Sequence, residues 1–226
     1  MNYRAFALAA LLGAPALPAL AGACGDLNIN QHDYRKGNGA DNMLFLVETR
    51  HFNEDVEMGI KGITGTLGGD LDYTLRHFPN HPRALNTVLR LAPRYRFTTI
   101  PGTQLPIECY FERAVRFYPD DSVGWLMYAR YQSLRGKDRE ALDMLKRAHA
   151  LAPDEPSINY NLGLAYARQK KFAEALPYAQ KAYAQEFPLP ALKQTLVKAG
   201  HWVEPAPLPK KAEAEAPADA AEPAKP

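Results

Sequence analysis

The strongest constraint on this chain is an internal repeat with a period of about 34 residues. Ala141 lies one period before Ala175, and Ala148 lies one period before Ala182. Within each period, apolar and small residues recur twice at the three- and four-residue spacing of an amphipathic helix. Such a helix cannot bury its apolar stripe alone, whereas stacked pairs bury a continuous core. The period therefore predicts an all-α solenoid of helical hairpins, with repeats at 122–153 and 156–187.

The residues at fixed positions of these repeats match a known pattern. They are Trp125, Ala141, Ala148 and Pro153 in one repeat, and Leu162, Gly163, Tyr166, Ala175 and Ala182 in the next. The pattern resembles the tetratricopeptide repeat (TPR), although Asn159, Gln132 and Phe187 replace its Trp, Tyr and closing Pro. The resemblance implies a TPR-like fold and a surface that binds a protein or peptide.

A third, distorted repeat is predicted upstream, at 82–119. The spacing from Pro79 to Pro119 is longer than one period, because Pro93–Pro106 interrupts the two helices. We expect this interruption to form a lip over one end of a binding groove. A lone helix at 70–78 and a closing helix at 189–199 complete a repeat region spanning 70–203.

The segment 22–69 is not repeat-like, and we expect it to cover the open face of the first repeat. Asn53 is placed to cap a short helix. The apolar residues at Met43–Val47 fit either a strand or a helical turn. Gly62–Gly69 is interpreted as a flexible connection, because it lacks the Gly-Lys-Ser/Thr of a phosphate loop.

The first residues have the form of an export signal. Arg4 precedes an uncharged apolar run, and Ala19-Leu20-Ala21 has the small-x-small pattern of a cleavage site, so residues 1–21 are predicted to be a signal peptide. The expected location is the periplasm, with secretion as an alternative. The run is too short to span a bilayer, and no later stretch qualifies.

The two cysteines, Cys24 and Cys109, leave three possibilities open. An oxidising compartment would allow a disulfide between them. Leu20–Cys24 also loosely resembles a lipoprotein box, in which Cys24 would carry a lipid anchor. Two free thiols are the third possibility.

Two features near the C-terminus complete the prediction. Residues 204–226 contain mainly Pro, Ala, Lys and Glu without an aromatic residue, and we expect them to be disordered. Pro177 falls inside the last predicted repeat helix, so that helix must start late or kink.

Position in the repeat also predicts a binding surface. In the family that the chain resembles, the first helix of each repeat lines the concave groove. Carried over by position, the groove residues are Arg83, Asn86, Arg90, Arg94, Arg130, Tyr160, Asn161 and Arg168, with Tyr128 as further contact surface. The arginines there would suit a carboxylate, which guanidinium groups bind in a bidentate manner.

Other classes of function are disfavoured. The net charge of +2 is too small to argue for nucleic acid or a membrane surface. His77 and His81 lie near each other in the sequence, but Pro79 lies between them and no third metal ligand is evident. No nucleophile motif is present, so we expect no enzyme, no cofactor and no metal.

The sequence therefore predicts a periplasmic TPR adaptor that binds a protein or peptide partner, with an acidic or carboxylate feature, through a basic groove. The alternative is a structural subunit of an envelope or cell-surface assembly, self-associating and anchored through Cys24.

Overall fold

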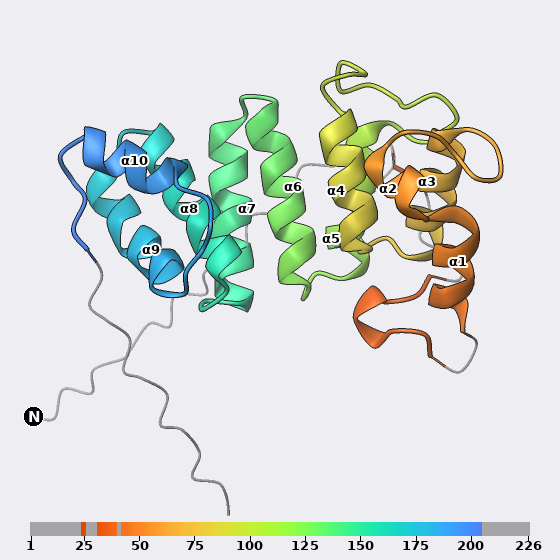
Figure 1. Cartoon of the computed structure of the whole chain (residues 1–226), viewed down its shortest axis with the longest axis horizontal. Coiled ribbons are helices and arrows are strands. Elements are labelled where there is room, and N and C mark those ends of the chain that lie inside the picture. Colours follow the sequence, from red (N-terminus) through yellow and green to blue (C-terminus); the bar gives the residue numbers. More distant parts are fainter. Residues whose placement is uncertain (1–23, 26–30, 40–41, 205–226) are drawn as a thin grey trace, which may run out of the picture. The chain divides into compact units, whose positions relative to one another are not determined.

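The computed structural model describes residues 24–25, 31–39 and 42–204 (Figure 1). The predicted signal peptide and almost all of the predicted tail lie outside this part. The described residues contain helices and no strand, as the period predicts. They form two compact units, one ending at Pro153 and the other beginning at Asp154, which are treated separately below. Within the described ranges, no helix has the length and apolar character needed to cross a membrane.

The first unit begins with a 3-10 turn, η1 (Tyr34–Lys36), and the helices α1 (Met43–His51) and α2 (Glu54–Met58). The ambiguous stretch at Met43 is thus helical, and a strand there is wrong. The predicted cap of α2 is present, since the Asn53 side chain accepts a hydrogen bond from Val56 N at 3.1 Å.

Helix α3 (Leu67–His77) starts earlier than expected, so Gly68 and Gly69 belong to a helix and not to a flexible connection. The side chain of Thr66 caps this helix by accepting from Gly69 N at 3.0 Å. Gly68 is needed for close approach, because a Cβ there would lie 2.3 Å from the carbonyl oxygen of Pro101.

The distorted repeat is formed by α4 (Pro82–Leu91) and α5 (Ile107–Phe117). The intervening segment does not project freely as a lip. Its second half is fixed to α3 through the contact of Pro101 with Gly68 and through Gln104 N, which donates to Asp72 Oδ1 at 3.2 Å. The expectation of a lip is therefore wrong for the part around residues 99–106.

The next hairpin, α6 (Ser122–Leu134) and α7 (Asp138–Leu151), is held by small residues. Ala129, Ala141 and Ala148 are completely buried, which lets the two helices approach closely. Trp125 of α6 is also buried, and it donates its Nε1 hydrogen to the carbonyl oxygen of Pro119 at 2.9 Å.

The second unit contains α8 (Pro156–Arg168), α9 (Phe172–Ala184) and α10 (Ala191–Lys198). Gly163 of α8 faces α9 so closely that a Cβ there would lie 3.2 Å from the carbonyl oxygen of Ala175. Pro177 lies within α9, which begins at Phe172, so a late start of this helix is wrong.

The N-terminal segment is tied to the rest of the first unit by polar contacts. Helix α1 packs on α3, and α2 packs on α3 and α4. The buried Asn80 amide donates to Asp33 at 2.8 Å and to Asp121 at 2.7 Å, so it joins the segment to two turns of the repeats. His51 of α1 binds the buried carboxylate of Asp70 at 2.8 Å.

Candidate functional site

Two predicted groove residues of the first unit are brought together by α4 and α6. Arg130 of α6 donates from Nη1 to Asn86 Oδ1 of α4 at 3.4 Å, and the same nitrogen lies 3.7 Å from Met127 Sδ. The Arg130 side chain is half-buried, and burial lowers its pKa. No carboxylate pairs with it anywhere in the described part of the chain. A half-buried guanidinium without a counter-ion is a candidate site for an anion.

Arg83, one turn before Asn86 on α4, already has partners within the chain. Its Nε donates to Glu57 Oε1 at 2.9 Å, and its Nη2 forms a close ion pair with Glu57 Oε2. Its Nη1 lies 3.4 Å from Glu48 Oε1. The hydrogen bond from Arg83 lowers the pKa of Glu57. Arg83 thus holds the N-terminal segment in place, and its guanidinium does not face an empty groove as predicted.

Arg90 is also engaged by α2. Its Nη2 donates to the main-chain carbonyl oxygen of Glu57, which accepts a second hydrogen bond from Thr87 Oγ1 at 2.7 Å. One residue of α2 therefore meets three residues on one face of α4. Arg94, just beyond α4, stays exposed, with its guanidinium carbon 5.6 Å from the ring centroid of Tyr95.

In the second unit, the three predicted groove residues differ in how far they are exposed to solvent. Tyr160 is only 5% exposed and packs against Phe187 at 4.6 Å between ring centroids, so it is a core residue. Asn161 is half-buried and donates to the carbonyl oxygen of Ser157 at 2.8 Å, and Arg168 is exposed at the end of α8. Tyr128 in the first unit is likewise buried, which corrects the expectation that these tyrosines offer contact surface.

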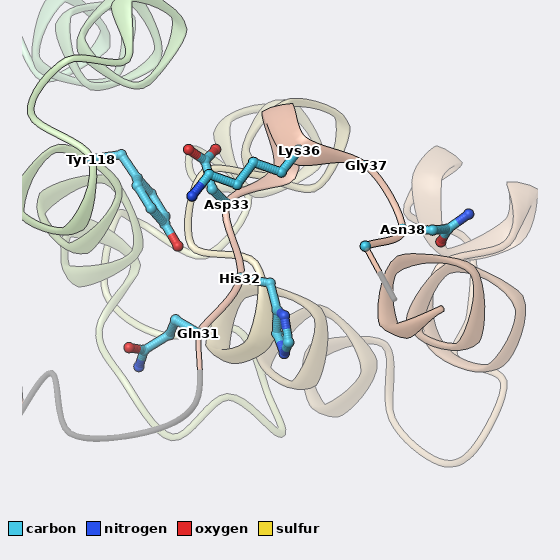
Figure 2. Close-up of a pocket in the computed structure, with 8 residues that line it drawn as sticks. Gln31, His32, Asp33, Lys36, Gly37, Asn38 and Tyr118 are labelled. Atoms are coloured by element: carbon cyan, nitrogen blue, oxygen red, sulfur yellow. The ribbon is translucent and has the colours of Figure 1, made fainter. Parts of the chain in front are cut away.

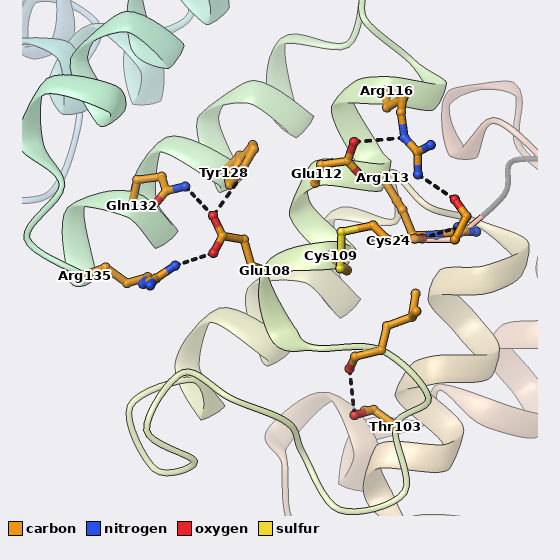
Figure 3. The surroundings of a disulfide bond; sticks show 12 residues. Cys24, Thr103, Glu108, Cys109, Glu112, Arg113, Arg116, Tyr128, Gln132 and Arg135 are labelled. Atoms are coloured by element: carbon orange, nitrogen blue, oxygen red, sulfur yellow. Dashed lines mark hydrogen bonds and ion pairs between the residues drawn. A yellow bond between two sulfur atoms is a disulfide. The ribbon is translucent and has the colours of Figure 1, made fainter. Parts of the chain in front are cut away.

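The cysteines form a disulfide between the N-terminal segment and α5 (Figure 3). Cys24 and Cys109 are both almost fully buried. Arg113 donates to the carbonyl oxygen of Cys24 at 3.1 Å, and Arg116 donates to that of Gly25 at 3.0 Å. A sulfur in a disulfide cannot also carry a lipid thioether, so this bond argues against the lipid-anchor alternative.

A pocket beside the N-terminal segment is lined by His32, Asp33, Lys36 and Tyr118, among others (Figure 2). The Asp33 carboxylate is already bound by Arg35 at 2.6 Å and by Asn80 at 2.8 Å. Because the Asp33 carboxylate is already paired within the fold, this pocket is a weaker candidate for a binding site than the guanidinium of Arg130.

Comparison with known proteins agrees with the repeat pattern. A family model described as a TPR repeat matches residues 134–170, from the end of α6 to the turn after α8. This stretch of the chain is a tetratricopeptide repeat. Repeats of this family bind proteins and typically act as non-catalytic scaffolds.

Among solved structures, the crystal structure of MamA is similar to this chain, with 18% sequence identity and a TM-score of 0.43. The match covers 60% of this chain and 78% of that one, and we draw no functional argument from a likeness at this level. No curated protein matches the sequence.

Proposed function

We propose that this protein is an exported TPR adaptor that holds a carboxylate-bearing segment of a partner protein on the face formed by α4 and α6. The observation that carries the proposal is Arg130, whose half-buried guanidinium bonds to Asn86 and meets no carboxylate in the described residues. Removing a cation from water without an anion is unfavourable for the free protein, and a partner carboxylate would offset that cost.

The geometry favours a carboxylate over other anions of protein origin. A guanidinium presents parallel N–H donors that match the two oxygens of a carboxylate. Asn86 beside it adds an amide with both donor and acceptor atoms. Together they could bind an acidic side chain or a C-terminal carboxylate.

The proposed location outside the cytoplasm rests on two supports. Disulfides persist in oxidising compartments, and the Cys24–Cys109 bond joins residues separated by 85 positions. The segment 1–21 has the pattern of a secretory signal, although it lies outside the described part of the structure. We place the adaptor in the periplasm.

The test is crosslinking and affinity capture from the envelope fraction of the source cells with the full exported chain. Three baits are compared: the unmodified protein, Arg130→Met, and Arg139→Met. Met retains much of the apolar stem of Arg while removing the charge. Arg139 is an exposed residue of α7 and controls for the loss of one positive charge.

The proposal predicts a defined protein that is captured by the unmodified and Arg139→Met baits and lost with Arg130→Met. Capture that is equal with all three baits would show that Arg130 is not the anchor. Capture of only further copies of the chain would instead favour the structural-subunit alternative.

A further inference from the structure

Histidines gather where the N-terminal segment meets α3 and α4. Four of the six histidines of the chain lie there: His32 and His51 on the segment, His77 at the end of α3, and His81 at the cap of α4. The main-chain N–H of His32 donates to the carbonyl oxygen of His77 at 2.8 Å. The His51 ring stacks on Tyr73 at 3.8 Å between centroids, and the Tyr73 ring lies 4.5 Å from that of His77. Imidazoles change charge between about pH 5 and pH 8, so this attachment contains groups that respond to mild acid.

His81 has partners at both of its ring nitrogens. Its Nδ1 accepts a hydrogen bond from Ala84 N at 3.2 Å, and its Nε2 lies 3.1 Å from Glu48 Oε1 of α1. Tyr34 and Phe52 pack on the buried ring at 4.6 Å and 4.7 Å between centroids. His81 therefore anchors the segment to the start of α4.

His77 lacks such partners. Its Nδ1 is buried and has no hydrogen-bond partner in the part of the chain that the structure describes. The C-terminal end of a helix favours a cation. However, burial lowers the pKa of His77, and the charges of Arg76, His32 and His51 lower it further. The attached segment therefore favours the neutral form of His77.

The carboxylates of α3 are already paired with other groups. Asp70 lies 2.8 Å from His51, and Asp72 pairs with Arg76 at 2.9 Å. Within the described ranges, no ion pair involves His77. A proton added to His77 would leave an unpaired cation near Arg76 and His51, and a cation that is buried without an anion is unfavourable.

We propose that His77 is a proton-operated latch for the N-terminal segment: a proton on its imidazole releases the stretch around His32 from the end of α3. The Cys24–Cys109 disulfide keeps the segment attached to α5, so it moves without separating from the protein. Its movement uncovers Phe78, which is fully buried and lies 5.3 Å from the His32 ring between centroids. The latch is independent of the proposed function, because it involves neither α6 nor a partner.

The direction of the pH response follows from the lowered pKa of His77. Above about pH 6.5, the ordinary pKa of histidine, this site is neutral in the closed and the open form, and the segment stays attached. As the pH falls below that value, the open form takes up the proton more readily, so opening becomes more frequent. Hydrogen bonds lower the pKa values of Glu48 and Glu57, so these carboxylates stay charged in this range.

The test is hydrogen exchange of the His32 amide, measured by NMR at about pH 7.5 and about pH 5.5 in the full exported chain with its disulfide intact. Each rate is compared with that of an unstructured peptide at the same pH, which gives a protection factor. His77→Phe is the decisive variant, because it keeps a ring beside Tyr73 and the main-chain acceptor while removing the titrating group. His201→Gln, at an exposed histidine of the second unit, is the matched control.

We expect the protection factor of the His32 amide to fall about tenfold from the higher to the lower pH in the unmodified chain and in His201→Gln. In His77→Phe it should be the same at both pH values. If His77→Phe already disturbs the contact at the higher pH, His77→Gln provides the comparison, because only the change with pH separates a latch from a packing role. Equal protection at both pH values in the unmodified chain, or the same fall in both His77 variants, would overturn the latch.

One carboxyl is tested separately. Burial raises the pKa of Glu112 on α5, the helix that carries Cys109. Glu112→Gln should leave the fall in protection unchanged if His77 is the latch. Loss of the fall in this variant would assign the response to Glu112 and overturn the role of His77.

Discussion

The N-terminal segment and the repeat hairpins of this protein are held together by different forces. In the α6–α7 and α8–α9 hairpins, buried alanines and a glycine let helices pack closely. The N-terminal segment, by contrast, is attached through a disulfide, an amide between two aspartates, a hydrogen bond between His51 and Asp70, and the ion pair of Glu57 with Arg83. The segment should therefore respond to redox conditions and pH, and the hairpins to side-chain volume.

The largest expected effect comes from removing the disulfide. Changing Cys24 and Cys109 to Ser should lower the free energy of unfolding of the first unit by about 2–5 kcal/mol, because the bond closes a long loop in the unfolded chain. Denaturant unfolding is followed by fluorescence of Trp125 in the first unit and Trp202 in the second, each with the other Trp replaced by Phe. An equal change in the unfolding midpoint at both tryptophans would contradict the expectation that the disulfide stabilises only the first unit.

Acid should loosen the N-terminal segment next, by about 1–3 kcal/mol between pH 7 and pH 3. Hydrogen bonds from Arg83 and His81 lower the pKa values of Glu57 and Glu48, respectively. Burial alone would raise the pKa of Asp70, but hydrogen bonds from Thr64, His51 and the loop amides lower it overall.

For a carboxyl whose pKa is lower in the folded state, the stabilisation is complete above its unfolded pKa of about 4 and is lost as the pH falls further. Glu112 acts in the opposite direction, because burial raises its pKa. The measurement is the unfolding midpoint at Trp125 as a function of pH, and the Asp70→Asn variant should show a shallower dependence. A midpoint at Trp125 that is flat from pH 6 to pH 3 would contradict the prediction.

A matched pair of glycines tests the packing of the hairpins. Gly163→Ala should destabilise the second unit by about 1–2 kcal/mol, because the new Cβ would lie 2.8 Å from Leu192 Cδ2 and 3.2 Å from the Ala175 carbonyl oxygen. Gly124→Ala in α6 meets nothing closer than 3.7 Å and should stabilise the first unit by up to about 1 kcal/mol through helix propensity. Both variants are measured by thermal unfolding. If both substitutions stabilise or both destabilise their units, the close approach at Gly163 does not determine the effect of the added methyl group.

The difference between the regions also explains how far the sequence could predict the fold. Repeat positions such as Ala141, Ala148 and Gly163 depend on contacts inside one hairpin, so the repeat period was enough to locate α6–α9. The attachment of Glu57 to Arg83 joins residues 26 positions apart, and no local pattern indicates it.

The candidate site shows the same limit. Arg130 and Asn86 were predicted from their places in the first helix of each repeat, and α4 and α6 bring them into contact. The same rule selected Tyr160, which is buried because its ring fills the core beside Phe187. The left-handed turn at Arg96 and Phe97 is a further feature that the sequence does not predict, since neither residue type signals such a turn.

The smallest expected effect comes from a comparison of Arg83 on α4 with Arg130 on α6. Arg83→Met should lower the free energy of unfolding of the first unit by about 0.5–1 kcal/mol, because it removes a largely exposed ion pair with Glu57. Arg130→Met should leave that free energy unchanged or raise it by up to about 1 kcal/mol. Burial without a carboxylate lowers the pKa of Arg130, so its charge opposes folding while Met keeps the packing of its stem.

Both variants are measured by denaturant unfolding followed at Trp125, in the same buffer and without any added anion. The opposite signs would mean that Arg83 serves the fold and Arg130 serves a ligand, since a residue that costs stability when unliganded is retained for another reason. If Arg130→Met costs as much as Arg83→Met, the Arg130 guanidinium has a stabilising role within the chain itself. Arg130 would then not be an uncompensated cation, and the proposal that it binds a partner carboxylate would be wrong.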